Sequence, residues 1–508
     1  MELRSSGCPG LWTRILVLCS LLAIVCGEAP AGAGILRLTH RYSDREGSSR
    51  ERDGGGGGMS KEHFQLLLDH DRGRRGRFLA EGVDFSLGGT ADPLSGGLYF
   101  TQVGLGNPVK HYIVQVDTGS DVLWVNCRPC SGCPRKSALN IPLTMYDPRE
   151  SSTTSLVSCS DPLCVRGRRF AEAQCSQTTN NCEYIFSYGD GSTSEGYYVR
   201  DAMQYNVISS NGLANTTSQV LFGCSIRQTG DLSTSQQAVD GIIGFGQLEL
   251  SVPNQLAAQQ NIPRVFSHCL EGEKRGGGIL VIGGIAEPGM TYTPLVPDSV
   301  HYNVVLRGIS VNSNRLPIDA EDFSSTNDTG VIMDSGTTLA YFPSGAYNVF
   351  VQAIREATSA TPVRVQGMDT QCFLVSGRLS DLFPNVTLNF EGGAMELQPD
   401  NYLMWGGTAP TGTTDVWCIG WQSSSSSAGP KDGSQLTILG DIVLKDKLVV
   451  YDLDNSRIGW MSYNCSDEVK VAGHAVIASH LDSNAAISTK PSRVVIFLLV
   501  FILSVCIH

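Results

Sequence analysis

The sequence predicts an all-β protein. Its 508 residues include 56 glycines and only 17% charged residues, a composition that favours strands and turns over long helices. Short β-branched and aromatic runs alternate with Gly, Asn-Gly, Asp-Gly and Pro turns, as in all-β architectures. Examples of such runs are Tyr112–Val116, Gly278–Ile282, Tyr302–Val305 and Leu448–Leu453. Helical patterns are sparse, and the clearest are Val252–Gln260 and Gly345–Thr358.

The charge balance argues against a nucleic-acid partner. The net charge is -12, with 37 Lys and Arg against 49 Asp and Glu, so a broad basic surface is not expected. A low content of basic residues also suits a protein that works in acid. There carboxylates become neutral, and a basic protein would accumulate repelling positive charge.

The N-terminal 27 residues are expected to be a secretory signal peptide. Arg4 and Arg14 flank the start of an apolar run, Ile15–Val25, which ends in small residues. Residues 28–85 are Arg-rich, contain five consecutive glycines and lack the pattern of a core. We interpret them as a pro-segment that is processed after Arg77 and carries a short helix at Lys61–Asp69; a disordered linker is the alternative.

The cysteines favour disulfides. Of sixteen, four fall in the terminal targeting segments, which leaves an even dozen in the body of a chain with secretory signals. The alternative is a zinc site at Cys127, Cys130 and Cys133, which the missing His-x-x-x-His partner disfavours. We therefore expect no metal.

The C-terminus has the arrangement of a glycosylphosphatidylinositol (GPI) attachment signal. After a polar stalk, residues 466–484, small residues lead through a polar spacer to an apolar tail, Val494–Ile507, which is short for a transmembrane helix. We expect attachment at Asn484 or Ser483 and removal of residues 485–508. A tail-anchored helix is the alternative. Candidate N-glycosylation sites are Asn215, Asn327 and Asn385, with Asn464 weaker because it precedes a cysteine.

Two copies of one motif carry the functional prediction. Val114–Trp124 is an apolar run that delivers Asp117 into a Thr-Gly turn, and Val331–Leu339 repeats it with Asp334 in a Ser-Gly turn. Either turn alone is common. Each copy is followed later by an apolar-apolar-Gly run, at residues 241–244 and 437–440, so the two halves of the chain correspond.

With these paired motifs the chain resembles the pepsin-type aspartic proteases, and among them the plant nepenthesin-like, membrane-anchored group. The resemblance covers about residues 97–465 and implies a bilobal fold with the active-site cleft between two related β-lobes. We place the lobes at residues 86–298 and 299–465. It also implies an aspartic endopeptidase that hydrolyses polypeptides with Asp117 and Asp334 as catalytic pair, needs no cofactor and acts as a monomer.

The chemistry follows from two carboxyl groups at close range. Both cannot ionise cheaply, so they share a proton and titrate as a pair. One then acts as general base on a water molecule, and the other donates a proton to the scissile carbonyl.

The resemblance assigns supporting roles to the neighbouring residues. Thr118 and Ser335 tie the two loops together, and Ser120 and Thr337 bond the outer carboxylate oxygens, although plain turn chemistry is the alternative. Gly119 and Gly336 let backbone amides approach the carboxylates.

The residues 184–192 match the family's flap, a strand leading into a glycine-rich hairpin that closes over substrate. In this match Tyr188 is the flap tyrosine, followed by Gly189, and the indole of Trp124 bonds the phenol. An aromatic strand of the core is the alternative.

The resemblance also implies six disulfides, concentrated ahead of the flap. Cys372 is expected to pair with Cys418, and Cys269 with Cys465. Spacing alone cannot choose among the N-terminal pairings.

The main alternative function is that of an inactive relative acting as an inhibitor or binding module at the cell surface. Such relatives commonly lose a catalytic Asp, its Gly or the flap Tyr, whereas all are present here. We therefore expect a secreted enzyme held by its lipid anchor on the extracellular face of the plasma membrane.

Overall fold

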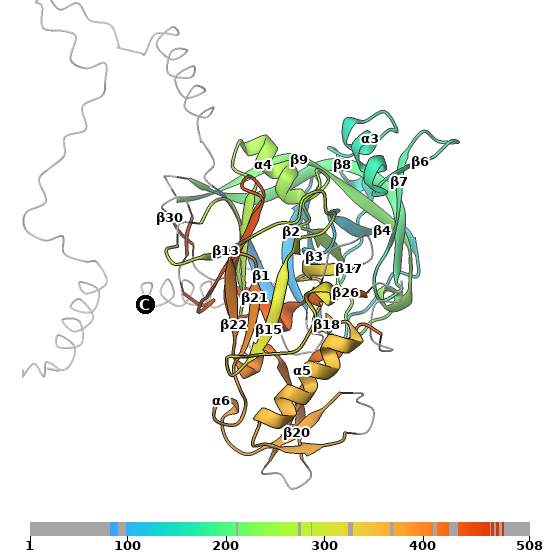
Figure 1. Cartoon of the computed structure of the whole chain (residues 1–508). Coiled ribbons are helices and arrows are strands. Elements are labelled where there is room, and N and C mark those ends of the chain that lie inside the picture. The colour runs from blue at the N-terminus through green and yellow to red at the C-terminus, as the bar shows by residue number, and fades with distance from the viewer. Residues whose placement is uncertain are drawn as a thin grey trace, which may run out of the picture. The chain divides into compact units, whose positions relative to one another are not determined.

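The computed structural model describes residues 82–481, except 90–97, 210–211, 273–275, 286, 324–328, 366–369, 410–413, 426–434, 468, 472–473 and 477–479. These residues form strands joined by turns, with a few short helices (Figure 1), and the all-β prediction is confirmed. No helix in this part of the chain is long and apolar enough to cross a membrane. The predicted signal peptide, the helix at Lys61–Asp69 and the apolar tail lie outside the described residues.

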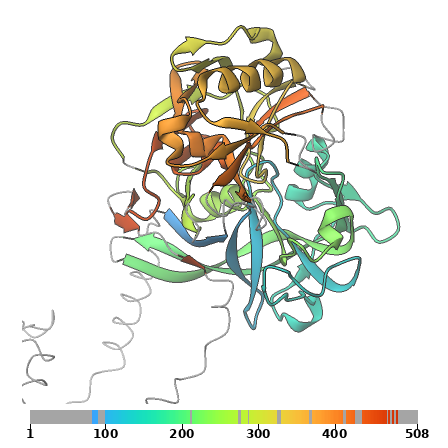
Figure 2. The same cartoon turned by 90° about the horizontal axis from the view of Figure 1, so that it is seen from below.

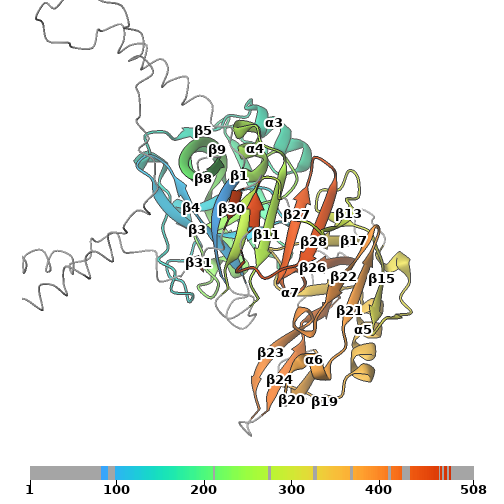
Figure 3. The same cartoon turned by 90° about the vertical axis from the view of Figure 1, so that its left-hand side faces the viewer.

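Strands from the first half of the chain and strands from its end together form one sixteen-stranded sheet. In chain order its strands are β1 (Gly82–Gly89), β2 (Tyr99–Leu105), β3 (Lys110–Asp117), β4 (Trp124–Ser131), β5 (Ser155–Leu156), β6 (Gln174–Cys175), β7 (Cys182–Ser187), β8 (Thr193–Ser209), β9 (Gly212–Thr229), β10 (Gly241–Gly244), β11 (Val265–Leu270), β12 (Gly278–Ile282), β13 (Thr291–Pro294), β27 (Lys447–Asp452), β28 (Arg457–Ser462) and β31 (His480–Leu481). The two halves join where β11 pairs with β27, with Phe266 opposite Tyr451 (Figure 3). These two rings stack at 4.4 Å.

The second half is divided among smaller sheets. One contains β14 (Asn303–Val304), β17 (Thr329–Met333), β26 (Gln435–Leu439), β18 (Ala340–Phe342) and β25 (Trp421–Ser423). A second contains β16 (Asn314–Arg315), β15 (Leu306–Val311), β21 (Val386–Phe390) and β22 (Gly393–Leu397), and a third β19 (Thr361–Val363), β20 (Cys372–Val375), β24 (Asp415–Ile419) and β23 (Leu403–Thr408).

Both predicted helices are present. Val252–Gln260 is α4, which ends at Asn261 in the left-handed conformation. The second is α5 (Ser344–Ala357), one residue earlier at each end than predicted. It lies beside the strands of the second half (Figure 2), where Phe350 stacks on Trp421 at 4.2 Å. The other α-helices described are α3 (Pro162–Gly167), α6 (Leu379–Leu382) and α7 (Asp441–Leu444).

Each half uses its apolar-apolar-Gly run in the same way. β10 runs parallel to β3 with Gly244 opposite Asp117, and β26 runs parallel to β17 with Leu439 opposite Met333. The backbone passes so close that a Cβ on Gly440 would lie 2.1 Å from the Leu339 carbonyl oxygen. Only glycine fits such an approach, and the aspartate loop is thereby fixed from behind.

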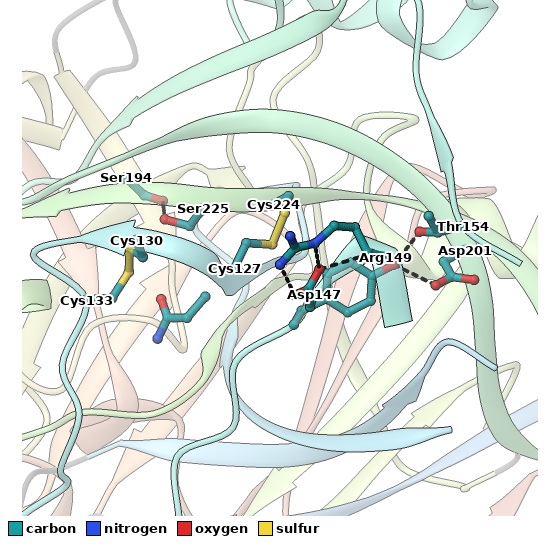
Figure 4. The surroundings of a disulfide bond; sticks show 12 residues. Cys127, Cys130, Cys133, Asp147, Arg149, Thr154, Ser194, Asp201, Cys224 and Ser225 are labelled. Atoms are coloured by element: carbon teal, nitrogen blue, oxygen red, sulfur yellow. Dashed lines mark hydrogen bonds and ion pairs between the residues drawn. A yellow bond between two sulfur atoms is a disulfide. The ribbon is translucent and has the colours of Figure 1, made fainter. Parts of the chain in front are cut away.

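Six disulfides cross-link the described residues, and both predicted pairings are confirmed. They join Cys269 to Cys465 and Cys372 to Cys418. The N-terminal pairs are Cys127–Cys224, Cys130–Cys133, Cys159–Cys175 and Cys164–Cys182. Figure 4 shows the first two, with the Asp147–Arg149 ion pair nearby.

These pairings leave no free thiol for the alternative zinc site. All three of its sulfur atoms belong to disulfides. The described part of the chain contains no cluster of three or more His, Cys, Asp or Glu side chains able to hold a metal ion.

The sheet begins earlier than the predicted start of the lobe at residue 86. β1 starts at Gly82, and the alternate residues Val83, Phe85 and Leu87 lie inside the core. It pairs with β12, β2 and β8. The glycine-rich composition hid this two-residue periodicity, so residues 82–85 are part of the core and not of a coreless pro-segment.

The polar-stalk prediction for residues 466–484 is wrong in its first part. β29 (Val469–Val471) and β30 (His474–Val476) form a hairpin, and Val469 and Val471 are fully buried in the cluster around the Cys269–Cys465 disulfide. Two valines separated by one lysine are enough to anchor this segment, because alternate residues of a strand face one side.

Candidate active site

The structure brings Asp117 and Asp334 together. Asp117 ends β3, Asp334 follows β17, and only 6% and 8% of their surfaces are exposed. Two residues after each aspartate, a glycine lies against the carboxyl group of the other aspartate. A Cβ on Gly119 would lie 2.6 Å from Asp334 Oδ1, and one on Gly336 would lie 2.1 Å from Asp117 Oδ1. The same glycines donate their amides to the Oδ1 atom of their own loop's aspartate at 2.8 Å.

The outer oxygens are held by hydroxyl groups, as the sequence predicts. Ser120 Oγ donates to Asp117 Oδ2, and Thr337 Oγ1 donates to Asp334 Oδ2 at 2.5 Å. Each carboxyl therefore receives one backbone and one side-chain hydrogen bond. This fixes the plane of both groups before any ligand binds.

Burial and mutual repulsion control the protonation of the pair. Burial, the largest cause, and the negative charge of Asp334 together raise the pKa of Asp117 to about 7, although the hydrogen bonds from Ser120 and Gly119 oppose the rise. A third buried carboxyl, Asp441, follows the second apolar-apolar-Gly run, and burial together with the charges of both aspartates raises its pKa well above 3.8. The site therefore holds a proton at mildly acidic pH.

The tie between the loops is asymmetric. Thr118 Oγ1 accepts the Ser335 amide at 2.8 Å and donates to the Met333 carbonyl at 3.3 Å. The matching Ser335 Oγ is buried but has no hydrogen-bond partner among the described residues. Of the two predicted ties, only the one from Thr118 is therefore made.

The predicted flap is a hairpin between β7 and β8, with Ser187 opposite Thr193. Trp124 Nε1 donates to the Tyr188 hydroxyl at 2.6 Å. Burial raises the pKa of Tyr188, and the negative charge of Asp117 raises it further. Nothing lies within 4 Å of a Cβ placed on Gly189, so its surroundings leave room for a side chain.

Sequence reasoning missed two polar residues beside the aspartates. Gln115 lies two residues before Asp117, and its Nε2 donates to the Gly336 carbonyl across the two halves at 3.3 Å. Asp121 lies four residues after Asp117 and accepts the Leu248 amide at 2.6 Å. The strand period of two points to Gln115, whereas Asp121 has no periodic signal.

Two of the predicted glycosylation sites, Asn215 and Asn385, are exposed on the surface. Asn327, Asn484 and Ser483 lie outside the described residues. The use of these sites stays a prediction.

Family models cover most of the chain. Residues 99–284 match the family described as Xylanase inhibitor N-terminal, and residues 301–462 match Xylanase inhibitor C-terminal. Aspartic proteinase 36 from Arabidopsis thaliana is 38% identical over 95% of this chain and 94% of its own length. Aspartic proteinase nepenthesin-1 from Nepenthes gracilis is 30% identical over 79% of this chain and 90% of its own.

Solved structures show the same fold. The structure titled "edgp" superposes with a TM-score of 0.61 at 19% identity and covers 80% of this chain and 99% of its own. Basic 7S globulin from soybean superposes with a TM-score of 0.57 at 22% identity over 76% of this chain and 99% of its own. At these identities the similarity shows the fold alone, and it confirms the predicted all-β fold of two lobes.

The asymmetric tie yields a prediction for a matched pair of variants. Thr118→Val removes a buried acceptor and leaves the Ser335 amide unpaired, so it should lower the free energy of unfolding by about 1–3 kcal/mol. Ser335→Ala removes a buried hydroxyl that makes no bond, and should be neutral or slightly stabilising. Urea denaturation of both variants checks this, and equal destabilisation by the two would contradict the asymmetry.

Proposed function

Since this chain belongs to the plant family of pepsin-like aspartic proteases and is an aspartic-type endopeptidase, we propose that Asp117 and Asp334 are its catalytic pair. The observation that carries the proposal is their juxtaposition, with each loop's glycine against the other loop's carboxyl. Its substrates are polypeptides.

The pair acts by general acid and base catalysis. One carboxylate removes a proton from a water molecule, whose oxygen attacks the scissile carbonyl carbon, while the other carboxyl donates the shared proton to the carbonyl oxygen. The resulting tetrahedral intermediate collapses when the departing amine receives a proton. The fixed hydrogen bonds from Ser120 and Thr337 keep both carboxyls oriented through these steps.

Tyr188 and Gly189 lie on the flap that covers bound peptide. The bond from Trp124 fixes the position of the phenol, and the hairpin supplies backbone groups for an extended substrate. A binding module or inhibitor without activity is the competing function, and the complete set of aspartates, glycines and flap tyrosine disfavours it.

The enzyme works as a monomer at the outer face of the plasma membrane. Six disulfides suit an oxidising compartment, and the signal peptide, the pro-segment and the GPI signal at Asn484 agree with secretion as a zymogen and anchoring by lipid. Because Val469 and Val471 are buried, we infer that the tether begins after the hairpin of β29 and β30, later than the sequence predicts.

Replacing either aspartate tests the catalytic assignment. Asp117→Asn and Asp334→Asn should each lower kcat by at least about 10³-fold on a diverse peptide library, because each removes one member of the acid–base pair. Asp298→Asn, an exposed turn residue, is the matched control and should retain activity. Cleavage by either site variant at the control's rate would overturn the assignment, and pepstatin should inhibit the wild type.

The pKa of Asp117 predicts the alkaline limit of activity. The pair retains its shared proton up to a pH of about 7, so kcat/KM should fall roughly tenfold per pH unit above that value. Because the folded pKa exceeds the unfolded one, this group also lowers the free energy of unfolding as pH rises from about 4 to 7. A pH profile of kcat/KM that is flat between 6 and 9 would contradict the shared proton.

The membrane anchor can be tested separately. Phosphatidylinositol-specific phospholipase C should release the protein from isolated membranes, because it cleaves the lipid from the attached glycan. Asn484→Gln, paired with Ser483→Gln to block the neighbouring site, should reduce the anchored fraction. Retention of the protein in the membrane after phospholipase treatment would instead favour a tail-anchored helix.

A further inference from the structure

A second pair of buried carboxyl groups lies behind the active-site loop. Asp121 and Glu172 are only 7% and 8% exposed, and a hydrogen bond joins their side chains. Asp121 belongs to the turn that follows Asp117. Glu172 belongs to an insertion between β5 and β7 that the Cys159–Cys175 and Cys164–Cys182 disulfides enclose.

The backbone of Glu172 is fixed at both its amide and its carbonyl. The amide donates to the Gly167 carbonyl at 3.0 Å, and the carbonyl accepts the Tyr198 hydroxyl at 2.6 Å. The side-chain Oε2 is buried and accepts no hydrogen bond from any described residue. A negative charge on Glu172 would therefore be uncompensated, and the neutral acid, which can donate to Asp121, is the favoured form.

Asp121 connects this acid to the catalytic loop. Its Oδ1 accepts the Leu248 amide at 2.6 Å, and the adjacent Ser120 carbonyl accepts the Gly246 amide at 2.8 Å. The backbone of Gly246 packs tightly against this carboxyl group, because a Cβ on Gly246 would lie 2.4 Å from Asp121 Oδ1. Ser120 is also the residue whose hydroxyl bonds Asp117.

The surrounding charges do not neutralise the pair. No Lys or Arg among the described residues forms an ion pair with either carboxyl. The basic side chain that acts electrostatically on Asp121 is His301, and Tyr198 and Tyr302 are further titratable neighbours. Arg166 of the insertion forms its ion pair with Glu249 at the surface.

We propose that Asp121 and Glu172 share one proton and form a clasp that holds the disulfide-bonded insertion against the active-site loop, which makes Glu172 a positioning residue for Asp117. The role in catalysis rests on the proposed function, whereas the clasp itself does not. Burial and the charge of Asp121 raise the pKa of Glu172 to about 9, so the clasp stays closed throughout the range in which the catalytic pair is protonated.

The test compares three variants by hydrogen–deuterium exchange and by kinetics. Glu172→Ala removes the donor, Glu172→Gln keeps a donor that needs no proton, and Glu249→Gln is the matched control, an acid that contacts the same insertion from the surface. We expect Glu172→Ala to raise exchange in residues 159–182 and at the Leu248 amide and to lower kcat/KM about tenfold. Glu172→Gln should restore both, and Glu249→Gln should resemble the wild type.

The wild type should also lose protection in these segments, relative to the intrinsic exchange rate, as pH rises through about 9, while Glu172→Gln keeps it. This arm decides the question even if Glu172→Ala does not fold. If protection in Glu172→Gln changes with pH in the same way as in the wild type, the proposed clasp is wrong. A wild type that cleaves no peptide would instead contradict the proposed function, and exchange would still report on the clasp.

Discussion

The architecture depends on one constraint: two buried carboxyl groups in contact cannot both carry a charge. Bringing Asp117 and Asp334 together costs free energy unless they share a proton and unless rigid donors hold them. Glycines at 119 and 336 are required because any side chain there would overlap the opposite carboxyl. The parallel strands β10 and β26 then hold each loop from behind, so the duplicated half-structure serves to maintain this single contact.

The same dependence on protons recurs away from the catalytic pair. Burial raises the pKa of Asp84 to about 6 and that of Asp240 to about 7, although Asp240 also accepts two backbone amides, from Ile113 and Thr144. Each such group binds a proton in the folded state that the unfolded chain has already released. The folded state therefore gains stability as pH falls from about 7 toward 4, and the enzyme's fold and its chemistry favour the same mildly acidic conditions.

Sequence motifs predict the residues of the active site, whereas the residues that surround it are brought there by packing between distant parts of the chain. The aspartate pair was predictable because each aspartate lies in one copy of a duplicated strand-turn motif, whereas the Trp124–Tyr188 bond was predicted only through the resemblance to the protease family. Glu172 was not predictable, because it lies in an irregular insertion without periodicity and reaches Asp121 only through folding. Two other misses have simpler causes: glycines disguised the alternation of β1, and the two valines of β29 were too short a signal within a polar segment.

Neutron diffraction of deuterated crystals grown near pH 5 can locate the proton that the two adjoining carboxyls share. We expect a single deuteron between Asp117 and Asp334, with Ser120 and Thr337 each donating a deuteron to the outer oxygens. Two fully ionised carboxylates, or carboxyl groups separated beyond hydrogen-bonding distance, would contradict the shared proton.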